Sequence, residues 1–339
     1  MTSVSTLSDL FNQAQLPFRV YHLGRRVMPC SRAHFSAFEQ ETVAWELPFK
    51  SEARIALVID SPTGNIELSR IWCLAFPLDE QGQLQPAARD HFLHRLLEAG
   101  LDASLHGQHE PQRDPMNDNP LAHAPDKMAR ALLHAWLCRD SGLPLSADAQ
   151  RATAYILAPQ ASSTSHWSTL SLQGVADGCV RLDDEQREQL ARALPQLADE
   201  VIATLCQCLE HVPCRHDTLA AALKQRTAHH DRLRALGIRA VASTHTAAAA
   251  QWLDELLASG AEVETLAAIS LRGWHHLEHA ERLPIFLNAL ASHPQVNLRD
   301  TLHDLALIPR LRLPVIMTLQ KANASTPLGK RLIAMGLNR

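Results

Sequence analysis

The sequence lacks any apolar run approaching the ~20 residues that a membrane-spanning helix needs. It also lacks an excess of basic residues, because its formal net charge is -4. Its N-terminus has neither the basic start nor the apolar core of a secretory signal. We therefore expect no membrane partner, and a nucleic-acid partner that depends on a general basic field is disfavoured.

Motifs that would identify an enzyme are missing as well. No credible active-site motif stands out, and no nucleotide-binding loop or nucleophile elbow follows the best-defined strand. The serines beside His166 favour a polar loop, because the members of a catalytic triad meet through the fold. The seven cysteines are scattered, and their odd number favours free thiols over a disulfide framework. We expect a cytoplasmic protein without a cofactor that is more typical of a binding protein than of an enzyme.

The best-specified stretch that is present covers residues 69–100. Residues 71–76 alternate between bulky and smaller apolar side chains, which predicts a strand that is apolar on both faces and central in its sheet. Pro77 ends this strand, and Pro86 suits the first turn of the helix that follows. Leucine and phenylalanine recur at helical spacing at positions 92, 93, 96 and 97, which predicts an amphipathic helix ended by Gly100.

The region before this stretch predicts a small α+β domain over residues 1–105. Short helices are expected at residues 7–11 and 35–38. Strand residues are expected at 18–28, around a break at Gly24, and a further strand is expected at 53–60. The turn residues at 61–65 predict that the second strand pairs antiparallel with the strand at 71–76. We therefore expect an antiparallel sheet with helices on one face.

A change of composition marks residues 106–125, which are rich in proline, asparagine and histidine. We interpret this segment as an exposed linker between two domains. Beyond it, residues 126–339 predict an all-α irregular helical stack joined by short connections. The predicted helices are 128–138, 147–157, 169–180, 186–212, 219–236, 244–257, 262–271, 275–291, 298–308, 313–322 and 328–337. Asp183 and Gln186 form a capping-box pattern, and Pro195 is expected to kink or divide the long helix.

Two clusters have the residue types of a zinc site. On a helix, His275 and His279 would share one face, with Glu278 placed to polarise a water. A third ligand from His293 or His303 would have to fold back onto that helix. A solvated helix face is the commoner meaning of this pattern, so we expect no zinc there.

The second cluster runs from Cys206 through Cys208, His211 and Cys214 to His216. Two cysteines two positions apart on a helix point in different directions, so both are not expected to face inward unless the helix unwinds. Buried thiols that behave as small hydrophobic side chains are the favoured interpretation, and we expect no metal here either.

A charged set lies around the predicted sheet and is the candidate polar site. Arg25 and Arg26 follow Gly24, Asp79 and Glu80 follow the strand at 71–76, and Arg89 with Asp90 opens the helix after it. These side chains are expected to meet at one end of the sheet. A structural ion-pair network is the favoured interpretation, and a phosphate or metal site is the alternative.

The sequence resembles a bacterial family, domain-of-unknown-function family 3549. The resemblance depends on motifs in order along nearly the whole chain: LGRR (23–26), IWCLAFPLDEQGQL (71–84) with AARDHFL after it, LQGVAD (172–177), RGW (272–274), AERLPIFL (280–287) and DLALIPRLR (304–312). His22 and Ala75 stand where the family pattern has an acidic residue and a lysine. The resemblance implies no activity and assigns no catalytic residue.

These observations favour a non-enzymatic interaction or scaffold protein that binds a protein partner through its helical surface. One alternative is an enzyme or phosphate-ligand binder with a polar site around Arg25, Asp79, Glu80 and Arg89. A weaker alternative is a zinc-binding protein that uses one of the two clusters.

Overall fold

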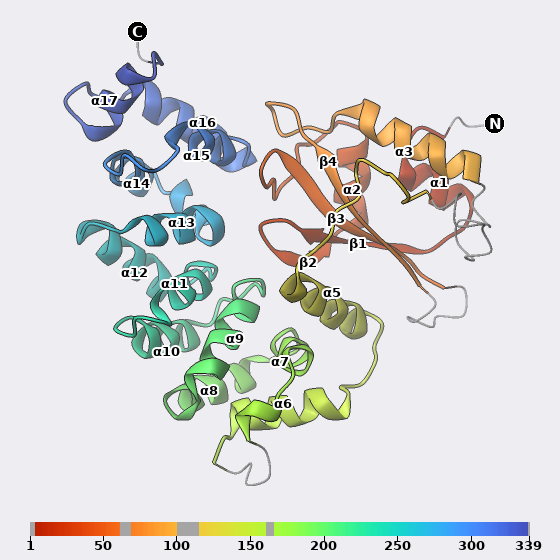
Figure 1. The fold of residues 1–339 in the computed structure, drawn as a ribbon, viewed down its shortest axis with the longest axis horizontal. Helices are drawn as coiled ribbons and strands as arrows, with labels where there is room; N and C mark the ends of the chain where they lie inside the picture. The colour runs from red at the N-terminus through yellow and green to blue at the C-terminus, as the bar shows by residue number, and fades with distance from the viewer. Residues whose placement is uncertain (1–3, 62–68, 100–114, 161–165, 338–339) are drawn as a thin grey trace. The chain divides into compact units, whose positions relative to one another are not determined.

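A computed structural model describes residues 4–61, 69–99, 115–160 and 166–337 of the chain. Internal contacts divide the chain into two compact units. The sheet unit comprises Met1–Ala129 with Leu307–Pro309, and the helical unit comprises Arg130–Ala306 with Arg310–Arg339. The predicted α+β fold class is confirmed, because a small antiparallel sheet near the N-terminus is followed by a long series of helices (Figure 1).

The sheet has four antiparallel strands in the order β2-β1-β3-β4. They are β1 (Phe18–Leu23), β2 (Val27–Cys30), β3 (Glu52–Ile59) and β4 (Arg70–Pro77). β3 and β4 pair in register from Glu52 opposite Pro77 to Ile59 opposite Arg70. The predicted strands and their antiparallel pairing are therefore confirmed, although most of the predicted turn at 61–65 lies outside the described residues.

Three helices cover one face of the sheet: α1 (Leu7–Gln13), α2 (Arg32–Glu39) and α3 (Pro86–Ala99). Successive strand residues point to opposite faces of the sheet, so every second side chain faces the helices. These strand side chains and the apolar side chains of the three helices form a single core. In α3, Leu96 is fully buried whereas the Leu97 side chain is half exposed. The apolar stripe predicted on this helix is therefore narrower than expected and excludes Leu97.

The prediction that residues 71–76 form a central strand is wrong. β4 lies at the edge of the sheet, and β1 and β3 occupy its centre. Trp72, Leu74 and Phe76 are buried on the core side, whereas Ile71 on the other side is 43% exposed. Apolar residues on both faces therefore did not indicate a central position here, because one of those faces is only partly covered.

Residues 115–125, the described part of the predicted linker, run beside β4. The N–H of Ala75 donates to the carbonyl oxygen of Leu121 over 2.8 Å, and the N–H of His123 donates to that of Cys73 over 2.9 Å. The Leu121 side chain joins the core of the sheet unit. Backbone pairing of this kind protects an edge strand from pairing with another chain. The linker and the domain limits around it stay predictions.

The helical unit holds most of the helices. They are α5 (Lys127–Asp140), α6 (Ala147–Leu157), α7 (Leu172–Cys179), α8 (Asp184–Ala193), α9 (Asp199–Leu209), α10 (Asp217–Thr227), α11 (Arg234–Ala242), α12 (Ala247–Ala258), α13 (Val263–Arg272), α14 (Arg282–Ala291), α15 (Leu298–Ala306), α16 (Pro309–Gln320) and α17 (Pro327–Ala334), with 3-10 turns η3 (Trp167–Thr169), η4 (Leu194–Gln196) and η5 (Trp274–Glu278).

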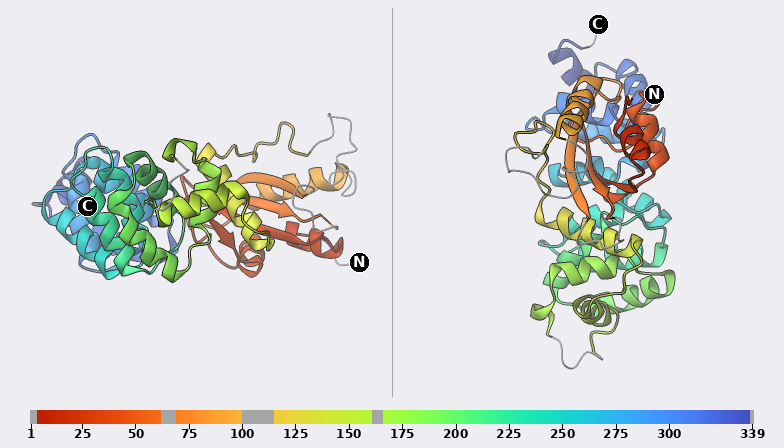
Figure 2. Two further views of the ribbon diagram at one scale, coloured as in Figure 1. Left: turned by 90° about the horizontal axis from the view of Figure 1, so that it is seen from below. Right: turned by 90° about the vertical axis from the view of Figure 1, so that its right-hand side faces the viewer.

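Eight of these helices, α7 to α14, pack in two rows. α7, α9, α11 and α13 succeed one another in the first row, and α8, α10, α12 and α14 form the second. Figure 1 shows the rows side by side, and the left view of Figure 2 looks along them. Stacking of this kind buries a continuous apolar interior between rows, as in helical repeat proteins.

Local sequence explains where the chain leaves its helices. The segment predicted as one helix over residues 186–212 is divided at Pro195, which lies in η4 and cannot donate an intrahelical hydrogen bond. The predicted capping box at Asp183 and Gln186 is confirmed at the start of α8.

The prediction of one helix over residues 219–236 is wrong, because the chain turns between α10 and α11. The two helices then pack closely at Gly237, where a Cβ atom would collide with the buried Thr227 side chain. A glycine inside a helix here marks a close crossing between helices.

Candidate functional site

The arginines of the predicted polar site are largely occupied within the sheet unit. Arg25 is fully buried, and its Nε donates to the carbonyl oxygen of Pro48 over 2.6 Å. Arg26 is also buried. Arg89 pairs with Asp90 at 2.8 Å and donates to the backbone carbonyl oxygen of Glu39. Arg89 and Asp90 thus form an ion pair, and the meeting of the whole set at one end of the sheet stays a prediction.

The acidic members of the set lie in a turn. The Asp79 carboxylate accepts hydrogen bonds of 2.8 Å from the backbone N–H groups of Gln81 and Gln83. Gly82 has the positive φ of 75° that this turn requires. Glu80 is exposed. Asp79 therefore stabilises its own turn. A ligand site around these residues stays a prediction.

A buried carboxylate that the sequence did not identify lies nearby, at Glu39. Its two oxygens accept from the backbone N–H groups of Leu7 and Ser8 (2.8 and 3.0 Å) and from the Ser8 hydroxyl (2.5 Å). It thereby bonds the first N–H groups of α1, which have no partner inside the helix. Burial raises the pKa of Glu39, although these hydrogen bonds and the charge of Arg89 oppose the shift. Glu39 therefore fastens the end of α2 to the start of α1.

The histidines at 275–279 do not form the helical face expected of a zinc site. His275 and His276 lie in the 3-10 turn η5 and His279 follows it, so His275 and His279 do not repeat at α-helical spacing. Nε2 of His275 and Nε2 of His276 lie 3.1 and 2.9 Å from the carbonyl oxygen of Thr244. Because a carbonyl oxygen only accepts, each Nε2 carries the proton. Burial lowers the pKa of His276 to about 4, so its ring is neutral at pH 7.

The thiols of the second cluster are buried. Cys206 and Cys208 are both inaccessible within an unbroken α9, so the expectation that they cannot both lie inside an intact helix is wrong. α9 packs against α7 and α11, which gives it more than one buried side. Burial raises the pKa of Cys206 to about 12. His216 accepts from the N–H of Leu219 and caps α10.

Within the residues that the structure describes, no group of three or more His, Cys, Asp or Glu side chains has the arrangement of a metal site. The absence of zinc from the two clusters itself stays a prediction.

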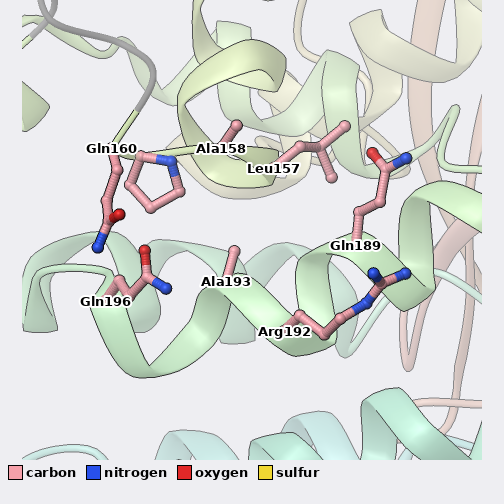
Figure 3. A pocket seen from close by; sticks show the side chains of 8 residues that line it. Leu157, Ala158, Gln160, Gln189, Arg192, Ala193 and Gln196 are labelled. Atoms are coloured by element: carbon pink, nitrogen blue, oxygen red, sulfur yellow. The ribbon is translucent and has the colours of Figure 1, made fainter.

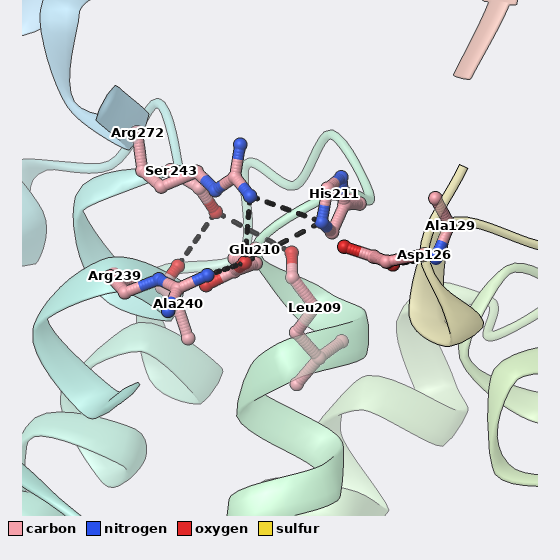
Figure 4. Close-up of polar contacts among 9 residues, drawn as sticks. All are labelled: Asp126, Ala129, Leu209, Glu210, His211, Arg239, Ala240, Ser243 and Arg272. Carbon is pink, nitrogen blue, oxygen red and sulfur yellow. Dashed lines mark hydrogen bonds and ion pairs between the residues drawn. The ribbon is translucent and has the colours of Figure 1, made fainter. Parts of the chain in front are cut away.

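An ionic cluster that sequence reasoning missed surrounds Glu210, directly after α9 (Figure 4). Oε1 of Glu210 accepts from Arg239 of α11 and from Arg272 of α13, the latter over 2.8 Å. Nε2 of His211 lies 3.5 Å from the same oxygen. Arg239 and Arg272 lie in the last turns of their helices. The cluster therefore joins the C-terminal ends of three successive helices of the first row.

Electrostatics explains the composition of this cluster. The C-terminal end of each helix carries a partial negative charge, so a carboxylate among three such ends needs cationic partners. Burial alone would raise the pKa of Glu210, but the contact with His211 and the charges of Arg272 and Arg239 lower it to about 2. Burial and Arg272 lower the pKa of His211 to about 4. At pH 7 the cluster thus contains an ionised carboxylate and a neutral imidazole. The ion pairs of this carboxylate with Arg239 and Arg272 hold the three helix ends together.

A shallow pocket of about 310 Å³ lies in the helical unit between the end of α6 and α8 with η4 (Figure 3). Gln160 and Gln196 face each other at one end, and Gln189 and Arg192 stand at the other. Among its described lining residues, Arg192 is the titratable one. These described lining residues therefore do not include the pair of groups that acid–base catalysis requires.

The last helices of the helical unit expose apolar side chains. On α16, the side chains of Leu313, Ile316 and Met317 are 64%, 39% and 42% exposed. Their i, i+3, i+4 spacing places them on one face of the helix, while Leu311 and Val315 on the other side are buried. We call Leu313, Ile316 and Met317 the α16 face.

A similar arrangement occurs on α17. Ile333 and the following Leu337 are 52% and 53% exposed, whereas Leu328 and Leu332 are buried. Nine large apolar side chains are exposed among the described residues, and six of them lie at or beyond Ile285. Exposed apolar surface is therefore concentrated at this end of the chain, a property typical of interaction sites.

A sequence profile of the family described as "Protein of unknown function (DUF3549)" covers residues 2–335. No curated protein and no solved structure matches. Within the described residues, no helix is both long and apolar enough to cross a membrane.

Proposed function

The chain belongs to the DUF3549 family, whose function is unknown, and on that premise we propose that it is a non-enzymatic interaction protein. It binds a protein partner through the α16 face. The observation that carries this proposal is the exposure of Leu313, Ile316 and Met317 on one side of a single helix. Apolar residues at this spacing are the pattern by which helices contact a partner.

The architecture of the helical unit supports this proposal. Helices stacked in two rows present an extended surface, which repeat proteins of this kind use for binding. A stack also needs polar terminal helices if it is to remain uncovered in water. Here the last two helices expose apolar side chains instead, so a partner that covers them would remove apolar surface from water.

The sites with ionisable groups support binding rather than catalysis. The Glu210 cluster is buried and holds helices together, and the pocket beside Arg192 has one titratable side chain among its described lining residues. Asp79 and Arg25 bond to the backbone of their own unit.

We place this interaction in the cytoplasm. All seven cysteines lie within the described residues as free thiols, and five of them are buried. Free thiols are typical of proteins in a reducing compartment.

The proposal is tested by co-purification of the tagged full chain from its native host. The test variant is Leu313→Ser/Ile316→Ser/Met317→Ser, and the matched control is Leu97→Ser, which changes an exposed leucine of the sheet unit. The melting temperature of each variant shows whether it still folds; because all four side chains are exposed, we expect little change.

Quantitative mass spectrometry of the retained proteins gives the answer. We expect at least one protein to be retained in near-equal amount by the wild type and by Leu97→Ser, and to fall by about tenfold with the triple variant. The same set of proteins with all three forms, or no retained protein with any of them, would contradict the proposal.

A further inference from the structure

We infer that the partner presents an acidic segment with apolar side chains at helical spacing, and that this segment binds the α16 face and the neighbouring lysines. This inference rests on the proposed function and specifies the chemistry of its partner. It comes from the distribution of charge along the chain together with the exposed apolar residues.

Residues 305–339 contain six basic residues and no aspartate or glutamate, although the whole chain has a net charge of -4. The last helices therefore carry a positive charge that the rest of the chain does not share. Negative charge on the partner would accelerate its association with this region. The same positive charge would repel partners that are themselves positively charged.

Two lysines lie beside the exposed apolar residues. Lys321 follows α16 and continues the face of Leu313 and Met317 at intervals of four residues. Lys330 lies three residues before Ile333 on α17, and both lysines are exposed. Each helix, taken with the residues that directly follow it, thus has both exposed apolar side chains and an exposed ammonium group. Carboxylates on a partner helix would pair with the ammonium groups while its apolar face covers the apolar side chains.

Basic residues at nearby positions are already engaged. Arg331 donates to the backbone carbonyl oxygens of His293 and Val296, both over 2.9 Å. Arg310 lies 3.8 Å from the carboxylate of Glu278. Lys321 and Lys330 are consequently the cations that we assign to the partner.

Other occupants fit these observations less well. A second copy of the chain would bring the same positive charges together across an isologous interface. A lipid surface is normally engaged by aromatic side chains beside the basic ones, and no aromatic residue follows Phe286. The same lack of aromatic residues removes the platforms on which single-stranded nucleic acids stack.

A binding assay with defined probes tests the inference. The probe is a fluorescent synthetic helical peptide with leucines at i, i+3, i+4 and i+7 and glutamates at its remaining positions. One control peptide replaces its glutamates with lysines, and the other replaces its leucines with serines. We expect the full chain to bind the glutamate–leucine peptide at least about tenfold more tightly than either control peptide.

Two variants of the chain separate the charge from the apolar contribution. Lys321→Glu/Lys330→Glu should weaken binding of the acidic peptide by about tenfold and should improve binding of the lysine peptide. Arg192→Glu, which reverses an exposed charge elsewhere in the helical unit, should leave both affinities unchanged. Equal affinity for the acidic and basic peptides would overturn the inference. Stronger binding to anionic phospholipid vesicles or to a single-stranded oligonucleotide than to the acidic peptide would also overturn it.

The co-purification assay distinguishes this inference from the proposed function. A partner that is lost with the α16 serine variant and also with Lys321→Glu/Lys330→Glu supports both. A partner that is lost with the serine variant but retained with the lysine variant leaves the proposed function standing and refutes an acidic partner. Failure of the serine variant to release any partner refutes the proposed function itself.

Discussion

The sheet unit and the helical unit each contain a buried glutamate, and the two carboxylates titrate in opposite directions. Burial raises the pKa of Glu39, whose carboxylate partners are the neutral N–H and hydroxyl groups at the start of α1. The pKa of Glu210 falls to about 2, because its contact with His211 and the charges of Arg272 and Arg239 outweigh its burial. Two guanidinium groups in direct contact, together with His211, thus outweigh the burial of Glu210, whereas the hydrogen bonds to Glu39 and the charge of Arg89 do not outweigh its burial.

The two glutamates also connect the chain differently. Glu39 joins two helices that already share the apolar core of the sheet unit. Glu210 joins the ends of three helices in one row, which otherwise contact each other along their sides. The stability of the helical unit should therefore depend more strongly on a single ionic cluster. The following predictions test this difference.

The largest effect is expected from Glu210→Gln. The substitution leaves the buried Arg272 without its carboxylate, a change that costs about 3 to 5 kcal/mol when a buried ion pair loses one partner. Urea unfolding at pH 7 measures the loss. Glu278→Gln is the matched control, because its pair with Arg310 is exposed and should contribute less than about 1 kcal/mol. Equal effects of the two substitutions would show that the Glu210 cluster is not a structural tie.

In the sheet unit, Leu96→Ala should destabilise by about 2 to 5 kcal/mol, because Leu96 is fully buried in the apolar core. Leu97→Ala on the same helix is the control and should change stability by less than about 0.5 kcal/mol. Chemical denaturation of both variants gives the comparison. An unchanged midpoint for Leu96→Ala would mean that α3 faces the sheet differently.

Glu39→Gln should have a smaller effect, about 1 to 3 kcal/mol. The amide keeps one acceptor oxygen but turns an NH₂ group toward donors at the start of α1, so one buried donor loses its partner. The same urea experiment measures this loss. A cost as large as that of Glu210→Gln would remove the difference between the two units.

The pH dependence of the two glutamate variants should differ in direction. The pKa of Glu210 is lowered in the folded state, so its contribution is present above the unfolded value of 4.5 and is lost as the pH falls toward about 2. The cost of Glu210→Gln should therefore shrink in acid. The pKa of Glu39 is raised, so the folded state binds this proton more readily and the contribution of Glu39 does not decline as the pH falls through that range. Urea unfolding between pH 7 and about pH 3 measures the free energy of unfolding of both variants and of the wild type. A cost that changes with pH in the same way for Glu210→Gln and Glu39→Gln would contradict the prediction.

The histidines of the helical unit add to its sensitivity to acid. His211 and His276 have folded pKa values of about 4 against 6.5 in the unfolded chain. The neutral rings therefore stabilise the fold above pH 6.5, and this stability is lost as the pH falls toward 4. Hydrogen exchange should show amides near Thr244 losing protection in this range before those of β1 and β3. The opposite order would contradict the prediction.

The smallest effect is expected from adding a metal chelator, because neither cluster is expected to bind zinc. A structural zinc site needs four ligands, whereas His275 and His276 bond to the Thr244 carbonyl and Cys206 is buried with a raised pKa. A chelator should leave the melting temperature of untagged protein unchanged, and elemental analysis should find no near-stoichiometric zinc. A melting temperature that falls by several degrees with the chelator would contradict the prediction that neither cluster binds zinc.

Periodicity of the sequence predicted the elements that depend on local pattern. The strands, the antiparallel hairpin, the capping box at Asp183 and the break at Pro195 each have a short-range cause, and each is present. The edge position of β4 was not predictable in the same way. It depends on which strands pair with it and on the segment around Leu121 that bonds to its free side.

Contacts between residues far apart in the sequence could not be predicted from local periodicity. Glu210, Arg239 and Arg272 are separated by about thirty residues each, and only the stacking of three helices brings them together. The position of Glu210 directly after an apolar helix stripe was a signal that its carboxylate is buried. The sequence did not indicate which residues pair with it. For α16, the apolar residues predicted a helix over 313–322 without showing that one side stays exposed.

Site-specific photocrosslinking tests the central claim most directly. A photoreactive phenylalanine analogue is placed at position 313 of the full chain in its native host, and a second strain carries it at position 97 as the matched exposed control. Our account predicts that position 313 crosslinks to one protein through an acidic segment of that protein, and that position 97 does not. The absence of a crosslink at position 313, or the same product from both positions, would contradict it.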